Sequence, residues 1–148
     1  MEAFATYLDA VTETIAAGDF DRYRTLCDLP MAVINASDTW VIDGEDALRS
    51  MFDRLVRSFS PEGGAAAAVR VPKAVTRLEP GLLYGVYETH LFAGNYRMAD
   101  PYESACLLRD GDGALRATMI TNRIALPNWQ LPHRDGAAGT HDMENASR

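Results

Sequence analysis

One continuous run of strand-forming residues, Leu82–Gly94, places the strongest constraint on how this chain can fold. It reads LLYGVYETHLFAG, is rich in aromatic and β-branched side chains, and lies between Pro80-Gly81 and Gly94-Asn95. Helical patterns precede this run and further strand-like runs follow it. We therefore predict a curved antiparallel sheet wrapped around helices, with a cavity between the two layers.

Three amphipathic helical patterns come before the long strand. The first ends at Gly18, a residue suited to a left-handed C-terminal cap, and Asp19 is placed to cap the second. The second helix is expected to end at Pro30, because the residue before a proline avoids helical geometry. The third follows Asp43 and ends at Ser60-Pro61.

The remaining pattern is that of an antiparallel sheet. Besides Leu82–Gly94, the expected strands are Met31–Asn35, Thr39–Ile42, Val69–Leu78, Tyr102–Arg109 and Ala114–Leu126. The Asp110–Gly113 turn between the last two strands is the strongest hairpin signal in the chain. The predicted fold class is therefore α+β, with three N-terminal helices packed in a curved, mostly antiparallel β-sheet.

Length and composition indicate one domain. The chain has 148 residues, and the segment from about Pro132 to Arg148 consists mainly of Gly, Ala, Asp, His and Asn. Such a segment offers no apolar stripe to bury. We predict a single domain over residues 1–131 and a disordered C-terminal tail over residues 132–148.

Charge and composition narrow the range of partners. The formal net charge of −7 argues against nucleic-acid binding, because phosphate contacts need a basic face. The chain contains no apolar run of the ~20 residues that a membrane span needs, and its first residues lack a basic signal region. We therefore expect neither a nucleic acid nor a membrane as a partner.

Cysteine and histidine usage adds two further expectations. Cys27 and Cys106 are far apart with no CxxC pattern, which favours a reduced, cytoplasmic protein with two buried thiols. The three histidines show no metal-ligand spacing, so we predict no metal and no cofactor.

The order of elements resembles that of a known superfamily. With Gly18-Asp19-Phe20 after the first helix and Val41-Ile42-Asp43-Gly44 before the third, Ala3 to Leu126 resembles the nuclear transport factor 2-like superfamily. That group includes ketosteroid isomerases, SnoaL-like polyketide cyclases, limonene-epoxide hydrolase, scytalone dehydratase and small subunits of ring-hydroxylating dioxygenases. The resemblance implies a cone-shaped, cystatin-like fold, an apolar pocket in the cone, and a homodimer formed through the sheet.

The ketosteroid isomerases in this group use two carboxyl groups and a tyrosine. Ungapped counting places Asn35 where that family has its base, Ala105 near its neutral aspartate and Val11 at its tyrosine. An amide cannot abstract a proton, so the resemblance does not extend to this chemistry.

A candidate site follows from the strand register. Counting from the Asp110–Gly113 turn places His90, Glu103 and Asn122 on one face, and the isomerase comparison assigns that face to the cavity. His90 is the candidate proton carrier, because imidazole exchanges protons near neutral pH, with Glu103 as its catalytic partner. The expected ligand-binding residues are Asn35, Trp40 and Asn122.

Each candidate has a structural alternative. The histidine can be a hydrogen-bonded strand residue, the glutamate a rim charge, and the asparagines turn or strand-end groups. If the register is displaced by one residue, the other face, with Tyr87 and Cys106, lines the cavity instead.

Two functions are compatible with these observations. One is binding of a small apolar molecule, with isomerase, cyclase, dehydratase or hydrolase activity by proton transfer. The other is a non-catalytic dimeric interaction domain or accessory subunit.

Overall fold

The computed structural model describes residues 1–58, 67–97 and 100–121. Asn122 and the whole of the predicted tail lie outside the described residues. In chain order the elements are α1 (Glu2–Ala17), α2 (Phe20–Arg24), β1 (Cys27–Ile34), β2 (Thr39–Ile42), α3 (Glu45–Ser58), β3 (Ala67–Glu79), β4 (Leu82–Ala93), β5 (Tyr96–Arg97), β6 (Tyr102–Gly111) and β7 (Ala114–Thr121).

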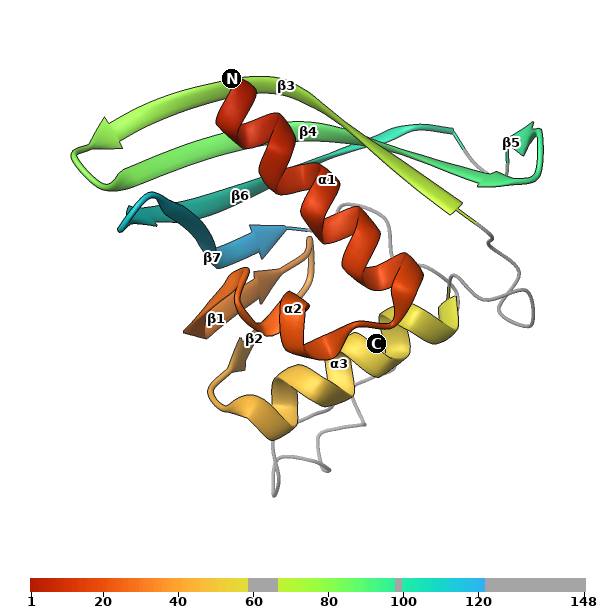
Figure 1. Ribbon diagram of the computed structural model, residues 1–148, viewed down its shortest axis with the longest axis horizontal. Helices are drawn as coiled ribbons and strands as arrows, with labels where there is room; N and C mark the ends of the chain where they lie inside the picture. Colours follow the sequence, from red (N-terminus) through yellow and green to blue (C-terminus); the bar gives the residue numbers. More distant parts are fainter. Residues whose placement is uncertain (59–66, 98–99, 122–148) are drawn as a thin grey trace.

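The strands form one curled sheet, and the helices lie on its inner side (Figure 1). The strand order is β2-β1-β7-β6-β4-β3, with β5 paired to β4. The β1–β7 pair is parallel and the other pairs are antiparallel. The predicted α+β cone, with three helices and a mostly antiparallel sheet, is confirmed.

The helix ends follow the local sequence signals. Gly18 ends α1 in the left-handed region at φ 67°, and the side chain of Asp19 accepts a hydrogen bond from the Arg22 backbone N–H at 3.1 Å. The second helix is shorter than predicted, because it ends at Arg24 and the chain enters β1 well before Pro30. The Leu26 carbonyl accepts a hydrogen bond from the Ala117 N–H of β7 at 2.9 Å, so the backbone at Leu26 pairs with the sheet and does not continue the helix.

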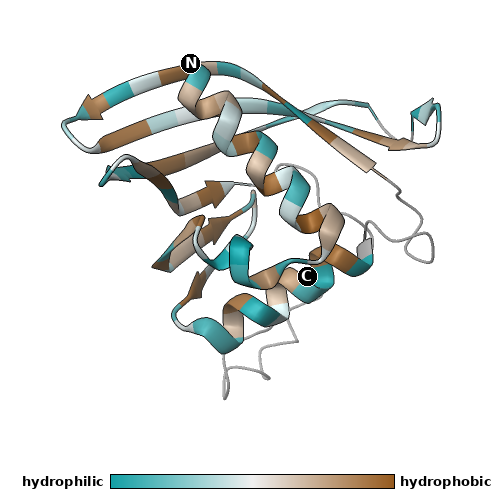
Figure 2. Cartoon of the chain, viewed as in Figure 1, coloured by the Kyte–Doolittle hydropathy of each residue, from teal (hydrophilic) through white to brown (hydrophobic). Residues whose placement is uncertain are grey.

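The core lies between α1 and the inner face of the sheet. Phe4 of α1 is 1% exposed and packs directly over Gly85 of β4, where an added Cβ would lie 2.4 Å from the Phe4 Cζ atom. A residue without a side chain therefore allows the helix to approach the sheet closely. Figure 2 shows that β3 and β4 both carry hydrophobic as well as hydrophilic residues.

A second part of the core joins the three helices. The Phe52 ring of α3 packs against Phe20, with ring centres 5.7 Å apart, and against Tyr23, with ring centres 4.8 Å apart. These contacts fix α2 and α3 at one end of the cavity that α1 and the sheet enclose.

Candidate ligand-binding cavity

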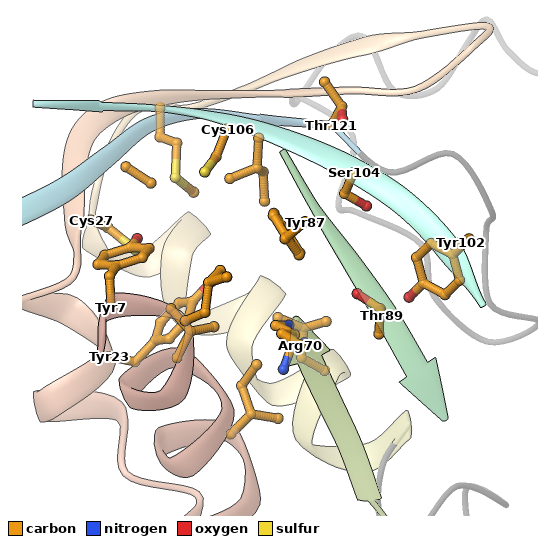
Figure 3. A pocket seen from close by; sticks show the side chains of 17 residues that line it. Tyr7, Tyr23, Cys27, Arg70, Tyr87, Thr89, Tyr102, Ser104, Cys106 and Thr121 are labelled. Atoms are coloured by element: carbon orange, nitrogen blue, oxygen red, sulfur yellow. The ribbon is translucent and has the colours of Figure 1, made fainter. Parts of the chain in front are cut away.

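A cavity lies between α1 and the inner face of the sheet, and α2, α3 and β1 also contribute side chains to it (Figure 3). The space open to the centres of water-sized molecules is about 90 Å³. At ~10–15 Å³ for each water, this space holds roughly six to nine water-sized groups. Most of the lining is apolar or aromatic, and a small number of hydroxyl groups and one guanidinium group face the cavity.

The prediction of which sheet face lines the cavity is wrong. Tyr87 and Thr89 of β4 and Ser104 of β6 line it, whereas His90 and Glu103 project from the opposite face of the same strands. The grouping of His90 with Glu103 was correct, because Glu103 pairs with the residue two positions before His90. The assignment of that group to the inside was not.

A bulge explains part of the error. Leu107 pairs with Met119 but Leu108 pairs with Ala117, so that β7 carries one extra residue at Thr118. Beyond this bulge the pairing of β7 with β6 is displaced by one residue relative to an unbroken count from the hairpin turn. Ile120 therefore lines the cavity together with β6 residues of the face that was expected to point outward.

His90 belongs to a polar cluster on the outer face. Its Nε2 lies 3.0 Å from Glu88 Oε1, and its Nδ1 lies 3.0 Å from Arg97 Nη1. An arginine can only donate, so Nδ1 accepts and the Nε2–H group donates to the carboxylate. The His90 ring also stacks on Phe92 at 6.4 Å. Both ring nitrogens of His90 therefore have hydrogen-bond partners on the outer face, away from the cavity.

Two other predicted site residues, Asn35 and Trp40, do not line the cavity either. Asn35 Oδ1 accepts hydrogen bonds from the backbone N–H groups of Ser37 and Asp38, both at 2.9 Å, and so closes the β1–β2 turn. Trp40 is half-buried on β2 opposite Val33 and packs against the core. Asn122 lies outside the described residues.

The structure reveals a polar row that the sequence analysis missed. Arg70 of β3 pairs with Thr89 of β4, which in turn pairs with Tyr102 of β6, and all three side chains line the cavity. Adjacent strands are ~4.8 Å apart, so the three side chains are neighbours across the sheet. In Figure 3 they lie on one side of the cavity, and Tyr7 and Cys27 lie on the other.

Burial keeps the hydroxyl and thiol groups of the lining protonated. It raises the pKa of Tyr87 to about 12, against the opposing effects of Arg70 and of a hydrogen bond with Ser104. Burial likewise raises the pKa of Tyr102, again against the effects of Arg70 and of a hydrogen bond with Thr89.

The two thiols of the lining behave in the same way. Burial raises the pKa of Cys27 to about 12 and that of Cys106 to about 12. Among the described residues that line the cavity, Arg70 therefore carries the formal charge at neutral pH, and the other polar groups are neutral.

A second hollow lies beside the N-terminal end of α1. It offers a larger space, about 310 Å³, but its charged side chains, Arg77 and Asp110, form an ion pair at 3.7 Å. Because these charges already compensate each other, the first cavity is the stronger candidate site.

The described residues offer neither a metal site nor a membrane-spanning helix. Within residues 1–58, 67–97 and 100–121, no three His, Cys, Asp or Glu side chains gather where they could hold a metal ion. None of the helices in this part of the chain combines the length and apolar character that crossing a lipid bilayer requires.

Comparisons with known proteins agree with the geometry of the fold. No protein family description matches the sequence, and no curated protein matches it. A nuclear transport factor 2-like protein of unknown function from Shewanella oneidensis is 15% identical, covers 83% of this chain and 98% of its own, and has a TM-score of 0.57.

Two further solved structures are similar at the same level. A protein of unknown function from Mycobacterium tuberculosis is 17% identical over 84% of this chain and 72% of its own, with a TM-score of 0.61. A candidate ketosteroid isomerase from Shewanella frigidimarina is 8% identical over 78% of this chain and 90% of its own, with a TM-score of 0.57. The chain is an α+β cone. Its fold is that of the nuclear transport factor 2-like superfamily, as the sequence resemblance indicated.

Proposed function

We propose that this protein binds a small, mainly apolar molecule carrying an oxygen function in the cavity between α1 and the sheet. The observation that supports the proposal is a largely apolar cavity into which a few hydroxyl groups and Arg70 converge. This is the usual composition of a small-molecule site. With space for roughly six to nine water-sized groups, the cavity suits a single ring or a short chain.

Binding has more support than proton-transfer catalysis. A general base should have a pKa near the working pH, and the described lining contains no carboxylate and no imidazole. Its phenols and thiols have raised pKa values, so they are poor bases at neutral pH. We therefore do not propose an isomerase, cyclase, dehydratase or hydrolase mechanism through these groups.

Ligand-observed NMR with single-ring alcohols, ketones and acids tests this proposal. Val11 of α1 lines the cavity, so Val11→Phe should fill it and abolish saturation transfer to the compounds that bind the unmodified protein. Val41→Phe is the matched control, because Val41 is 42% exposed on β2 and does not line the cavity. Absence of binding by every compound, or binding that survives Val11→Phe, would contradict the proposal.

We also propose that a second copy of this chain covers the outer face of β3, β4 and β6. Val69, Val71 and Tyr84 project from this face and are 49%, 40% and 37% exposed, while the helices cover the inner face alone. An antiparallel sheet with two apolar faces needs two covering layers. Light scattering should give the mass of a dimer, and Val71→Lys should shift it toward the monomer, while Val41→Lys should not. A monomer at micromolar concentration would refute the proposal.

A cytoplasmic location is proposed on the basis of the thiols. Cys27 and Cys106 are both free and buried, as is typical of proteins in a reducing compartment. Fractionation of cells that express the protein tests this location, and recovery outside the cytoplasm would contradict it.

A further inference from the structure

The orientation of Arg70 is the reverse of what its strand sequence favours. Val69 and Val71 project outward and are 49% and 40% exposed, while the arginine between them lines the cavity. When a sheet is covered on one face only, a strand with alternating apolar and charged residues normally points its valines toward the core and its charged side chains toward water. The inversion brings a cation into an otherwise apolar and neutral cavity.

Arg70 lacks an anionic partner within the described part of the chain. Its Nη1 donates to the Thr12 hydroxyl oxygen at 2.9 Å, a neutral acceptor on α1. By contrast, Arg24, Arg77 and Arg109 each pair with a carboxylate, at 3.1, 3.7 and 2.7 Å. These three surface arginines are thus paired with carboxylates, whereas the arginine of the cavity has most of its five donors available.

An unpaired cation in an apolar site favours an anion as its ligand. A partly buried charge is costly unless it is paired, and a guanidinium group matches a carboxylate through two parallel hydrogen bonds. One formal positive charge balances a monoanion, whereas a phosphate dianion would stay under-compensated. The neutral hydroxyls of Thr89 and Tyr102 lie next to Arg70 in the same row. They are hydrogen-bonded to each other, which leaves one hydroxyl hydrogen to donate to a carboxylate oxygen.

We infer that the ligand class of this cavity is a small apolar carboxylate, with its carboxylate at the Arg70–Thr89–Tyr102 row and its apolar part among the aliphatic side chains of the lining. This inference rests on the proposed function. The cavity volume limits the ligand to roughly six to nine non-hydrogen atoms, a single ring or a short chain.

Two nearly isosteric probes test the inference, cyclohexanecarboxylate and cyclohexanecarboxamide. They differ in charge and hardly in shape, and isothermal titration calorimetry at pH 7 gives the affinity of each. The unmodified protein should bind the carboxylate at least about tenfold more tightly than the amide, since charge-assisted hydrogen bonds are the stronger ones. Arg70→Gln should remove this preference, because it should weaken binding of the carboxylate far more than binding of the amide. Circular dichroism reports whether the variant is folded.

Two further variants make the experiment specific. Arg77→Gln removes an arginine from the same strand outside the cavity, and should change neither affinity. Arg70→Lys keeps the charge without the planar fork, and should retain an intermediate preference. Arg70→Lys also tests the role of the guanidinium group if Arg70→Gln does not fold.

The outcomes separate the two proposals. Equal affinity for acid and amide in the unmodified protein, or a preference that survives Arg70→Gln, would overturn the inference and leave the binding proposal intact. Binding of neither probe, together with none of the compounds used above, would overturn both.

Discussion

Substituting Gly85 by alanine should destabilise the fold by overpacking the contact between α1 and the sheet. The new Cβ would lie 2.4 Å from the Phe4 Cζ atom, whereas ordinary contacts of a Cβ begin near 3.4 Å. Phe4 would have to move by about 1 Å, and its ring is 1% exposed, so there is no solvent into which it can turn. Overpacking of this kind costs ~1–3 kcal/mol.

Thermal and urea unfolding, followed by circular dichroism, measure this cost. At ~2–4 °C per kcal/mol for a chain of this size, the melting temperature should fall by several degrees. Gly111→Ala is the matched control, because an added Cβ there meets no atom within 4 Å. That variant should be neutral or slightly stabilised, since alanine restricts the unfolded chain more than glycine does.

A double-mutant cycle tests the cause of the effect. In a Phe4→Leu background the ring that blocks the Cβ is gone, so Gly85→Ala should cost clearly less than it does in the unmodified protein. The same cost in both backgrounds, or no cost in either, would refute the overpacking argument.

Three further predictions concern buried polar groups. Tyr7→Phe removes the hydrogen bond from the phenol to the Leu26 carbonyl at 2.8 Å and should cost ~1 kcal/mol in urea unfolding; an unchanged midpoint would contradict this. Burial raises the pKa of Tyr87 to about 12, above the unfolded value of about 10, so its contribution to stability is complete below pH 10 and is lost as pH rises toward 12. The unfolding free energy should therefore fall between pH 10 and 12, and a constant value would count against the assignment. Because burial raises the pKa of Cys106 to about 12, native protein should react with iodoacetamide at pH 8 far more slowly than urea-unfolded protein, as mass spectrometry would show, and equal rates would disprove its burial.

Local signals were sufficient to predict the fold. Gly18 and Asp19 mark the α1–α2 boundary, and the Asp110–Gly113 turn marks the β6–β7 hairpin, because caps and turns depend on neighbours in sequence. The end of α2 was missed because the pairing of Leu26 with Ala117 joins segments far apart in the chain. No local pattern contains that contact.

The cavity was harder to predict than the fold. A strand alternates between two faces, but the sequence does not say which face is inside when both carry apolar residues. His90 is a familiar proton carrier and so drew attention, although its contacts with Glu88 and Arg97 are on the outer face. Arg70 was overlooked because an arginine between two valines is typical of a solvent-facing charge.

The most direct test of the account is a crystal structure of the protein with cyclohexanecarboxylate bound. We expect the ring to lie between α1 and the inner face of the sheet, with its carboxylate oxygens within hydrogen-bond distance of the Arg70 guanidinium. Occupancy of the outer face beside His90, or of the hollow beside Arg77, with the cavity left without ligand, would contradict it.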